Sequence, residues 1–130
     1  MNGPWIAAGG LALLGTVIHA LGGERIVFSD THPRAIAGAG SSTARSLART
    51  TWHLTTAAFA VLGTAALVCG FIGVTAATKG AARVVAAGFS AFAVMVIVSA
   101  LAGGGRGLLR HPAPLMLTVT ATLAWWGVIQ

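Results

Sequence analysis

Four long apolar runs alternate with short polar connectors along the chain. The clearest run extends from Trp52 to Val74 and contains no Asp, Glu, Lys or Arg. As a helix, this run of 23 residues would be roughly 34 Å long, enough to cross a hydrocarbon layer about 30 Å thick. The whole pattern predicts membrane spans at about residues 4–21, 50–74, 81–102 and 112–129.

Proline and glycine mark the ends of these spans. Pro4 and Pro112 each suit a first helical turn, where the missing N–H is not needed. Gly22 and Gly23 are expected to stop the first span, although the run is short and the alternative is that it continues one turn into Glu24 and Arg25. Four spans joined by short connectors predict an all-α fold, an integral membrane antiparallel four-helix bundle, and the length predicts a single domain over residues 1–130.

The composition supports the membrane assignment. Charged residues make up 8% of the chain, whereas a soluble domain carries about 25%, so the lipid bilayer is the predicted partner of most of its surface. The tryptophans fall where interfacial rings belong, Trp52 at one side and Trp5, Trp125 and Trp126 at the other. Met1 to Pro4 has no basic residue, so the first run is expected to be a retained span and not a signal peptide.

The net charge of +6 does not point to a nucleic-acid partner. The basic residues lie in the connectors between apolar runs and form no continuous basic face. Connectors rich in Lys and Arg stay on the cytoplasmic side of a membrane. Only Lys79 and Arg83 lie on the side of the termini, so both termini are predicted to be outside the cytoplasm. The six basic residues of the opposite side are Arg25, Arg34, Arg45, Arg49, Arg106 and Arg110.

Small residues occur in every predicted span. Lipid is as apolar as leucine, so membrane helices associate through close packing at such residues. The same faces could also dock against other membrane subunits or a second copy of the chain. The small residues expected at helix contacts are Ala8, Ala12, Gly15 and Thr16 in the first span, Ala57, Ala60, Gly63, Thr64 and Gly70 in the second, Ala87, Ser90, Ala91 and Ala102 in the third, and Thr118, Ala121 and Thr122 in the fourth.

Three histidines gather at the predicted cytoplasmic end. His19 lies near the end of the first span, His53 opens the second and His111 opens the fourth. Gly15, four residues before His19, lies on the same helix face and leaves room beside the imidazole. Thr56 shares the face of His53 and offers it a hydrogen-bonding group. The neighbours in sequence that complete the candidate site are Glu24, Arg25, Arg49 and Trp52.

Three interpretations of these histidines stay open. In the first they are structural and tie the helix ends together through hydrogen bonds. In the second they ligate haem or a transition metal, with His19 and His53 as the first candidates, His111 as the third, and Glu24 orienting one imidazole through its second nitrogen. In the third they bind a quinone or a lipid headgroup. The spacing contains no HxxxH, ExxH or CxxC, and without a nucleophile–base pair an enzyme is the least supported class.

The strings HALGGERIVF and TTWHLTT resemble a group of small bacterial membrane proteins with four spans. In that group a His-x-x-x-Gly-Glu-Arg segment ends the first span and a Trp-His pair starts the second. The resemblance implies a bacterial inner-membrane location and a joint role for the matching residues, and it implies no activity. The prediction is a small binding protein with a His/Arg/Glu cluster at its cytoplasmic end or, alternatively, an accessory subunit of a larger complex. The matching positions are His19, Gly23, Glu24, Arg25, Trp52 and His53.

Overall fold

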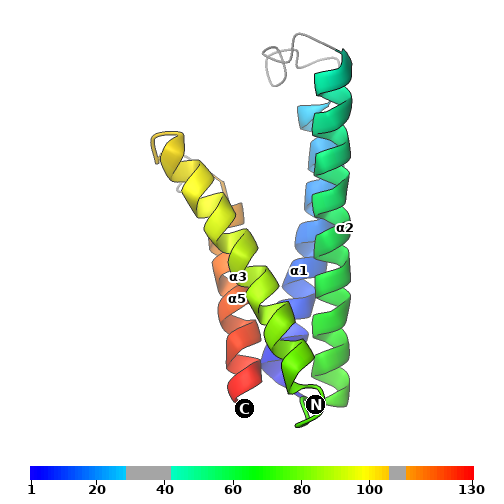
Figure 1. Ribbon diagram of the computed structural model, residues 1–130, viewed down its shortest axis with the longest axis vertical. Helices are drawn as coiled ribbons and strands as arrows, with labels where there is room; N and C mark the ends of the chain where they lie inside the picture. The colour runs from blue at the N-terminus through cyan, green and yellow to red at the C-terminus, as the bar shows by residue number, and fades with distance from the viewer. Residues whose placement is uncertain (29–41, 106–110) are drawn as a thin grey trace.

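The chain forms four α-helices and no strand within the residues that the computed structural model describes, which are 1–28, 42–105 and 111–130 (Figure 1). Each apolar run of the sequence forms one helix. The all-α prediction is therefore confirmed, and the arrangement is compatible with a four-helix bundle. The helices are α1 (Gly3–Gly22), which continues as the π-helix η1 (Gly23–Val27), then α2 (Ser42–Ile72), α3 (Lys79–Ala102) and α5 (Ala113–Ile129).

Helix α1 ends at Gly22, where the sequence predicted an end, and the backbone continues past it into Glu24 and Arg25, the alternative that the sequence left open. The Gly23 N–H still donates to carbonyls one turn back, and the Phe28 N–H donates to the Gly23 carbonyl. The backbone therefore winds on as a π-helix to Val27. Gly23 allows a close contact with Trp52, because a Cβ at this position would overlap the indole of that residue.

Three helical segments are long and apolar enough to cross a membrane: α1 with the start of η1, α2 and α3. Helix α2 starts at Ser42, before the predicted span start at residue 50, and its 31 residues are roughly 46 Å long. Helix α5 is also apolar but has only 17 residues. Large hydrophobic side chains point outward from every helix, among them Leu14, Val61, Met95 and Leu115. This outer surface suits contact with lipid.

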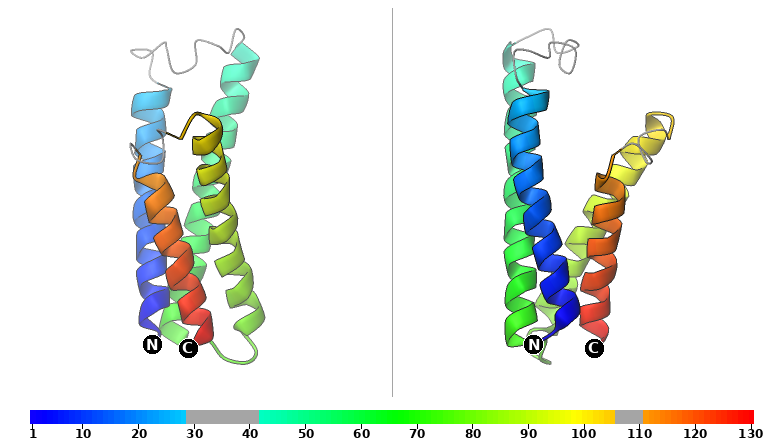
Figure 2. Two further views of the ribbon diagram at one scale, coloured as in Figure 1. Left: turned by 90° about the vertical axis from the view of Figure 1, so that its left-hand side faces the viewer. Right: turned by 180° about the vertical axis from the view of Figure 1, so that it is seen from behind.

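The helices pack as two pairs. Helix α1 packs most extensively against α2, and α3 packs against α5. The two pairs meet mainly through α1 and α5, whereas α2 and α3 touch much less. Both termini lie at the same end of the molecule, and the two pairs diverge toward the opposite end (Figures 1 and 2).

The end that holds the termini is closed by Asn2 and Trp5. The Asn2 amide donates to the Gly127 carbonyl at 3.0 Å, and the Asn2 backbone N–H donates to the Gly70 carbonyl at 2.8 Å. Trp5 is fully buried and packs against Gly127. The prediction that Trp5 is an interfacial ring is therefore wrong, because the absence of a side chain at Gly127 leaves room for the indole inside the bundle.

Small residues fill much of the interior, as the sequence predicted. Only some of the small residues that were expected at helix contacts are buried there. Aromatic rings of Trp5, Phe59 and Phe89 fill the remaining space. Five of the expected small residues are buried: Ala8, Ala12, Gly63, Gly70 and Ala121. Those that face outward instead are Ala57, Thr64, Ala87, Ala91, Ala102, Thr118 and Thr122.

Candidate functional site

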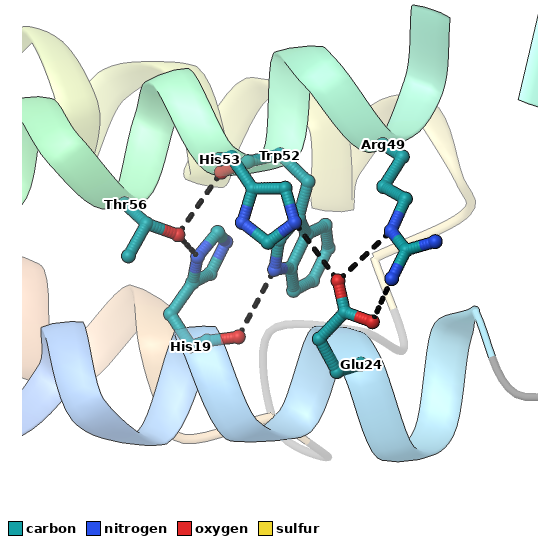
Figure 3. Close-up of polar contacts among 6 residues, drawn as sticks. All are labelled: His19, Glu24, Arg49, Trp52, His53 and Thr56. Carbon is teal, nitrogen blue, oxygen red and sulfur yellow. Dashed lines mark hydrogen bonds and ion pairs between the residues drawn. The ribbon is translucent and has the colours of Figure 1, made fainter. Parts of the chain in front are cut away.

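A polar cluster joins the end of α1 and η1 to the first half of α2, at the end of the molecule away from the termini (Figure 3). We call this group the histidine cluster. It has an inner half around His19 and an outer half around Glu24, and all its side chains face across the contact between the two helical segments. Its members are His19, Glu24, Arg49, Trp52, His53 and Thr56.

The imidazole of His19 is fixed on several sides. Its Nδ1 forms a hydrogen bond with Thr56 Oγ1 at 2.9 Å. The ring of Trp52 stacks on it, with ring centroids 3.9 Å apart and planes within 6° of parallel. The Trp52 Nε1–H also donates to the His19 carbonyl at 3.0 Å. These contacts hold the imidazole in one orientation.

The outer half of the cluster is centred on the Glu24 carboxylate. Arg49 donates two hydrogen bonds to it, one of them from Nε at 3.0 Å, and His53 Nε2 lies 2.8 Å from Oε1 (Figure 3). The Arg49 and His53 side chains are 56% and 49% exposed, so water screens these charges. The outer half therefore links η1 to α2 at the surface and does not form an enclosed site.

A cavity of about 200 Å³ lies next to the inner half of the cluster. All four helices contribute to its wall, which is almost entirely apolar. Gly15 and His19 lie at its α1 side, and space is open around the Gly15 Cα, as the sequence indicated. The cavity is at the end where the helix pairs diverge. Other residues of its wall are Thr55 and Phe59 of α2, Phe92 of α3, and Met116 and Thr120 of α5.

The structure brings together five of the seven predicted site residues. His19, His53, Glu24, Arg49 and Trp52 belong to one cluster, and Glu24 contacts an imidazole as expected, that of His53.

The remaining two predicted residues stand apart. His111 is exposed before the start of α5, and within the described ranges it makes no hydrogen bond or ion pair. Arg25 is exposed on η1.

The two candidate metal ligands use their nitrogens differently. His53 Nε2 forms a hydrogen bond with Glu24. His19 forms its hydrogen bond through Nδ1, with Thr56, and the Nε2 atom of His19 has no hydrogen-bond partner in the described chain. Of these two, only His19 lines the cavity. Among the residues that the structure describes, no group of three His, Cys, Asp or Glu side chains is placed to hold a metal ion. Joint ligation by His19 and His53 stays a prediction.

Sequence reasoning missed the true partner of Thr56 and the wall on α3 and α5. The shared helix face predicts that Thr56 bonds to His53, but Thr56 bonds to His19 across the helix contact. Spacing along one helix carries no information about which side chain of another helix lies opposite. The glycine four residues before His19 was the one signal in the sequence for the cavity.

In comparisons with known proteins, no family model, no curated protein and no solved structure matches the chain.

Proposed function

We propose that the chain is a four-span protein of the bacterial inner membrane, with both termini outside the cytoplasm, that binds one small apolar molecule in the cavity beside His19. The cavity carries this proposal, because it is lined by all four helices and has a fixed imidazole at its wall. Binding sites for small molecules are mostly apolar and contain a few polar groups that set the orientation of the ligand.

The size of the cavity indicates the size of the ligand. An apolar cavity of about 150 Å³ inside a helical protein accepts benzene. A cavity of about 200 Å³ therefore suits one substituted ring.

A structural role for the histidine cluster is the second candidate. Every hydrogen bond of the cluster that crosses between helical segments joins α1 or η1 to α2, none of them involving α3 or α5 in the described chain. A cluster with this geometry can pin one helix pair while the outer faces dock against another membrane subunit. The two candidates differ in whether anything enters the cavity.

Binding of 4-fluorotoluene to the protein in lipid nanodiscs tests the proposal. The probe is followed by fluorine NMR, and empty nanodiscs correct for its partition into lipid. Gly15→Leu fills the cavity, and Gly10→Leu is its matched control, because both glycines are on α1 with open space around them but only Gly15 lines the cavity. We expect the wild type and Gly10→Leu to bind the probe and Gly15→Leu to lose it. Equal binding by both variants, or no binding by the wild type, would contradict the proposal.

The absorption spectrum and metal content of the purified protein test ligation of haem or a transition metal. A Soret band, or stoichiometric Zn, Cu or Fe that is lost in His19→Ala, would show that the site is a metal centre and would contradict binding of an apolar ligand. Wild-type protein that binds 4-fluorotoluene and shows neither a Soret band nor stoichiometric metal supports the proposal that the cavity binds an apolar molecule.

A further inference from the structure

We infer that the ligand of the cavity carries a hydrogen-bond donor, a phenol-type hydroxyl, which it gives to Nε2 of His19. This inference rests on the proposed function and names the class of molecule that the site takes. The polar hydrogen atoms of the cavity wall are already used in hydrogen bonds within the protein.

Thr56 determines which nitrogen of His19 carries the proton. Its hydroxyl has one hydrogen, and Oγ1 donates it to the Trp52 carbonyl at 3.0 Å. The same oxygen lies 2.9 Å from His19 Nδ1, so both hydrogen bonds form together only when Nδ1–H is the donor. A neutral imidazole has a single N–H. His19 Nε2 is then an unprotonated acceptor.

The other polar side chains of the cavity wall are acceptors as well. The Thr55 hydroxyl donates its hydrogen to the Thr51 carbonyl at 3.0 Å, and the Thr120 hydroxyl donates to the Met116 carbonyl at 2.8 Å. Among the described residues of the wall, no hydroxyl hydrogen is left over for a ligand. A wall of acceptors favours a molecule with a hydroxyl and disfavours one whose polar atoms are all acceptors, such as an oxidised quinone.

A free imidazole nitrogen with its other nitrogen held by a hydrogen bond is also the arrangement of a metal ligand. Among the described residues of the wall, His19 is the only His, Cys, Asp or Glu, whereas a structural or catalytic zinc takes three or four such ligands, so the cavity favours an organic ligand. An apolar ring with one hydroxyl satisfies both the acceptor and the surrounding carbon surface.

Three probes of similar size separate these possibilities in nanodiscs: 4-fluorophenol is a donor, 4-fluorotoluene has a methyl group in place of the hydroxyl, and 4-fluorobenzaldehyde is only an acceptor. After correction for partition into lipid, we expect 4-fluorophenol to bind about tenfold more tightly than 4-fluorotoluene, the effect of one hydrogen bond to an unpaired acceptor. We expect 4-fluorobenzaldehyde to bind more weakly than 4-fluorophenol. His19→Phe should abolish the preference for the phenol, and His53→Phe, which leaves the cavity wall intact, should keep it.

The nitrogen chemical shifts of His19 in the wild type give a second readout that needs no substitution at His19. They should report a protonated Nδ1 and an unprotonated Nε2, and Thr56→Val should remove this preference.

The outcomes separate the inference from the proposed function. If 4-fluorotoluene binds as tightly as 4-fluorophenol, if the aldehyde binds best, or if His19→Phe keeps the phenol preference, the donor inference is overturned and the binding cavity stands. If none of the probes binds, the proposed function itself fails. An Nε2–H tautomer of His19 would also overturn the donor inference.

Discussion

Trp52 is the residue on which the geometry of the histidine cluster most depends. Its indole stacks on His19, donates to the His19 carbonyl and meets the ring of Phe28 edge-on. Gly23 makes this position possible, because any larger residue there would overlap the indole. The Trp-His pair and the Gly-Glu-Arg segment are therefore two halves of one contact.

We expect Trp52→Ala to lower the free energy of unfolding by about 2–3 kcal/mol, because the substitution removes a stack, a hydrogen bond and a half-buried ring. Glu24→Gln should cause a smaller loss, since its ion pairs are at the surface. Titration with sodium dodecyl sulfate in mixed micelles measures both. Trp126→Ala, which removes an exposed tryptophan from the other end of the molecule, serves as the control. A Trp52→Ala variant as stable as Trp126→Ala would contradict the role given to Trp52.

At the residue scale, most members of the histidine cluster could be predicted from the sequence, but the hydrogen bonds between them could not. Helix ends and spacing were sufficient to place His19, Glu24 and His53 at one end of the bundle. The pairing of His19 with Thr56 depends on how α1 is rotated against α2. That rotation is a property of the packed pair and cannot be obtained from the pattern of either helix.

At the scale of the elements, the contact between α1 and α2 depends on glycines that let the backbones approach. A Cβ at Gly9 would be 2.8 Å from the Leu67 backbone nitrogen and 2.9 Å from the Gly63 carbonyl oxygen. Such distances are too short for real atoms, so a side chain there would force the helices apart. Close backbone approach at small residues is how membrane helices gain van der Waals contact.

Gly9→Ala and Gly10→Ala should change stability in opposite directions. Gly9→Ala should destabilise the protein by about 1–3 kcal/mol because it overpacks the contact. Gly10→Ala meets nothing within 4 Å and should stabilise by up to about 1 kcal/mol, since alanine favours a helix over glycine. The same detergent titration measures the pair. If both substitutions stabilise, the two helices are not packed through Gly9.

The sequence predicted where helices occur but not which side of each faces inward. Small and apolar residues cover these helices all round, so Ala8 and Ala87 look alike in the pattern although one is buried and the other exposed. The contact of Gly23 with Trp52 could not be predicted for a related reason. A glycine that ends a helix and a glycine that makes room for a ring on another helix are the same in sequence.

At the scale of the whole molecule, two helix pairs meet at the end with the termini and diverge at the end with the histidine cluster (Figure 2). The diverging end contains the cavity and the basic residues Arg25, Arg45 and Arg49. In the proposed orientation this end faces the cytoplasm, and a ligand would reach the cavity from that side of the bilayer or from the lipid between the pairs.

Cysteine labelling in right-side-out spheroplasts tests this orientation. In a Cys69→Ala background, Gln130→Cys and Ala77→Cys should react with a membrane-impermeant maleimide, because the C-terminus and the turn after α2 are predicted outside. Ser46→Cys at the opposite end of α2 should react only after permeabilisation. Reaction of Ser46→Cys alone in intact spheroplasts would mean that the orientation is inverted.

The proposed function and the donor inference both require an apolar cavity among four helices with the fixed imidazole of His19 at its wall. Magnetisation transfer between 4-fluorotoluene and the histidine rings of the protein in nanodiscs tests it most directly. We predict transfer from the probe to the imidazole protons of His19 and none to those of His53, whose ring is engaged by Glu24 outside the cavity. Transfer to neither ring, or equal transfer to both, would contradict the account.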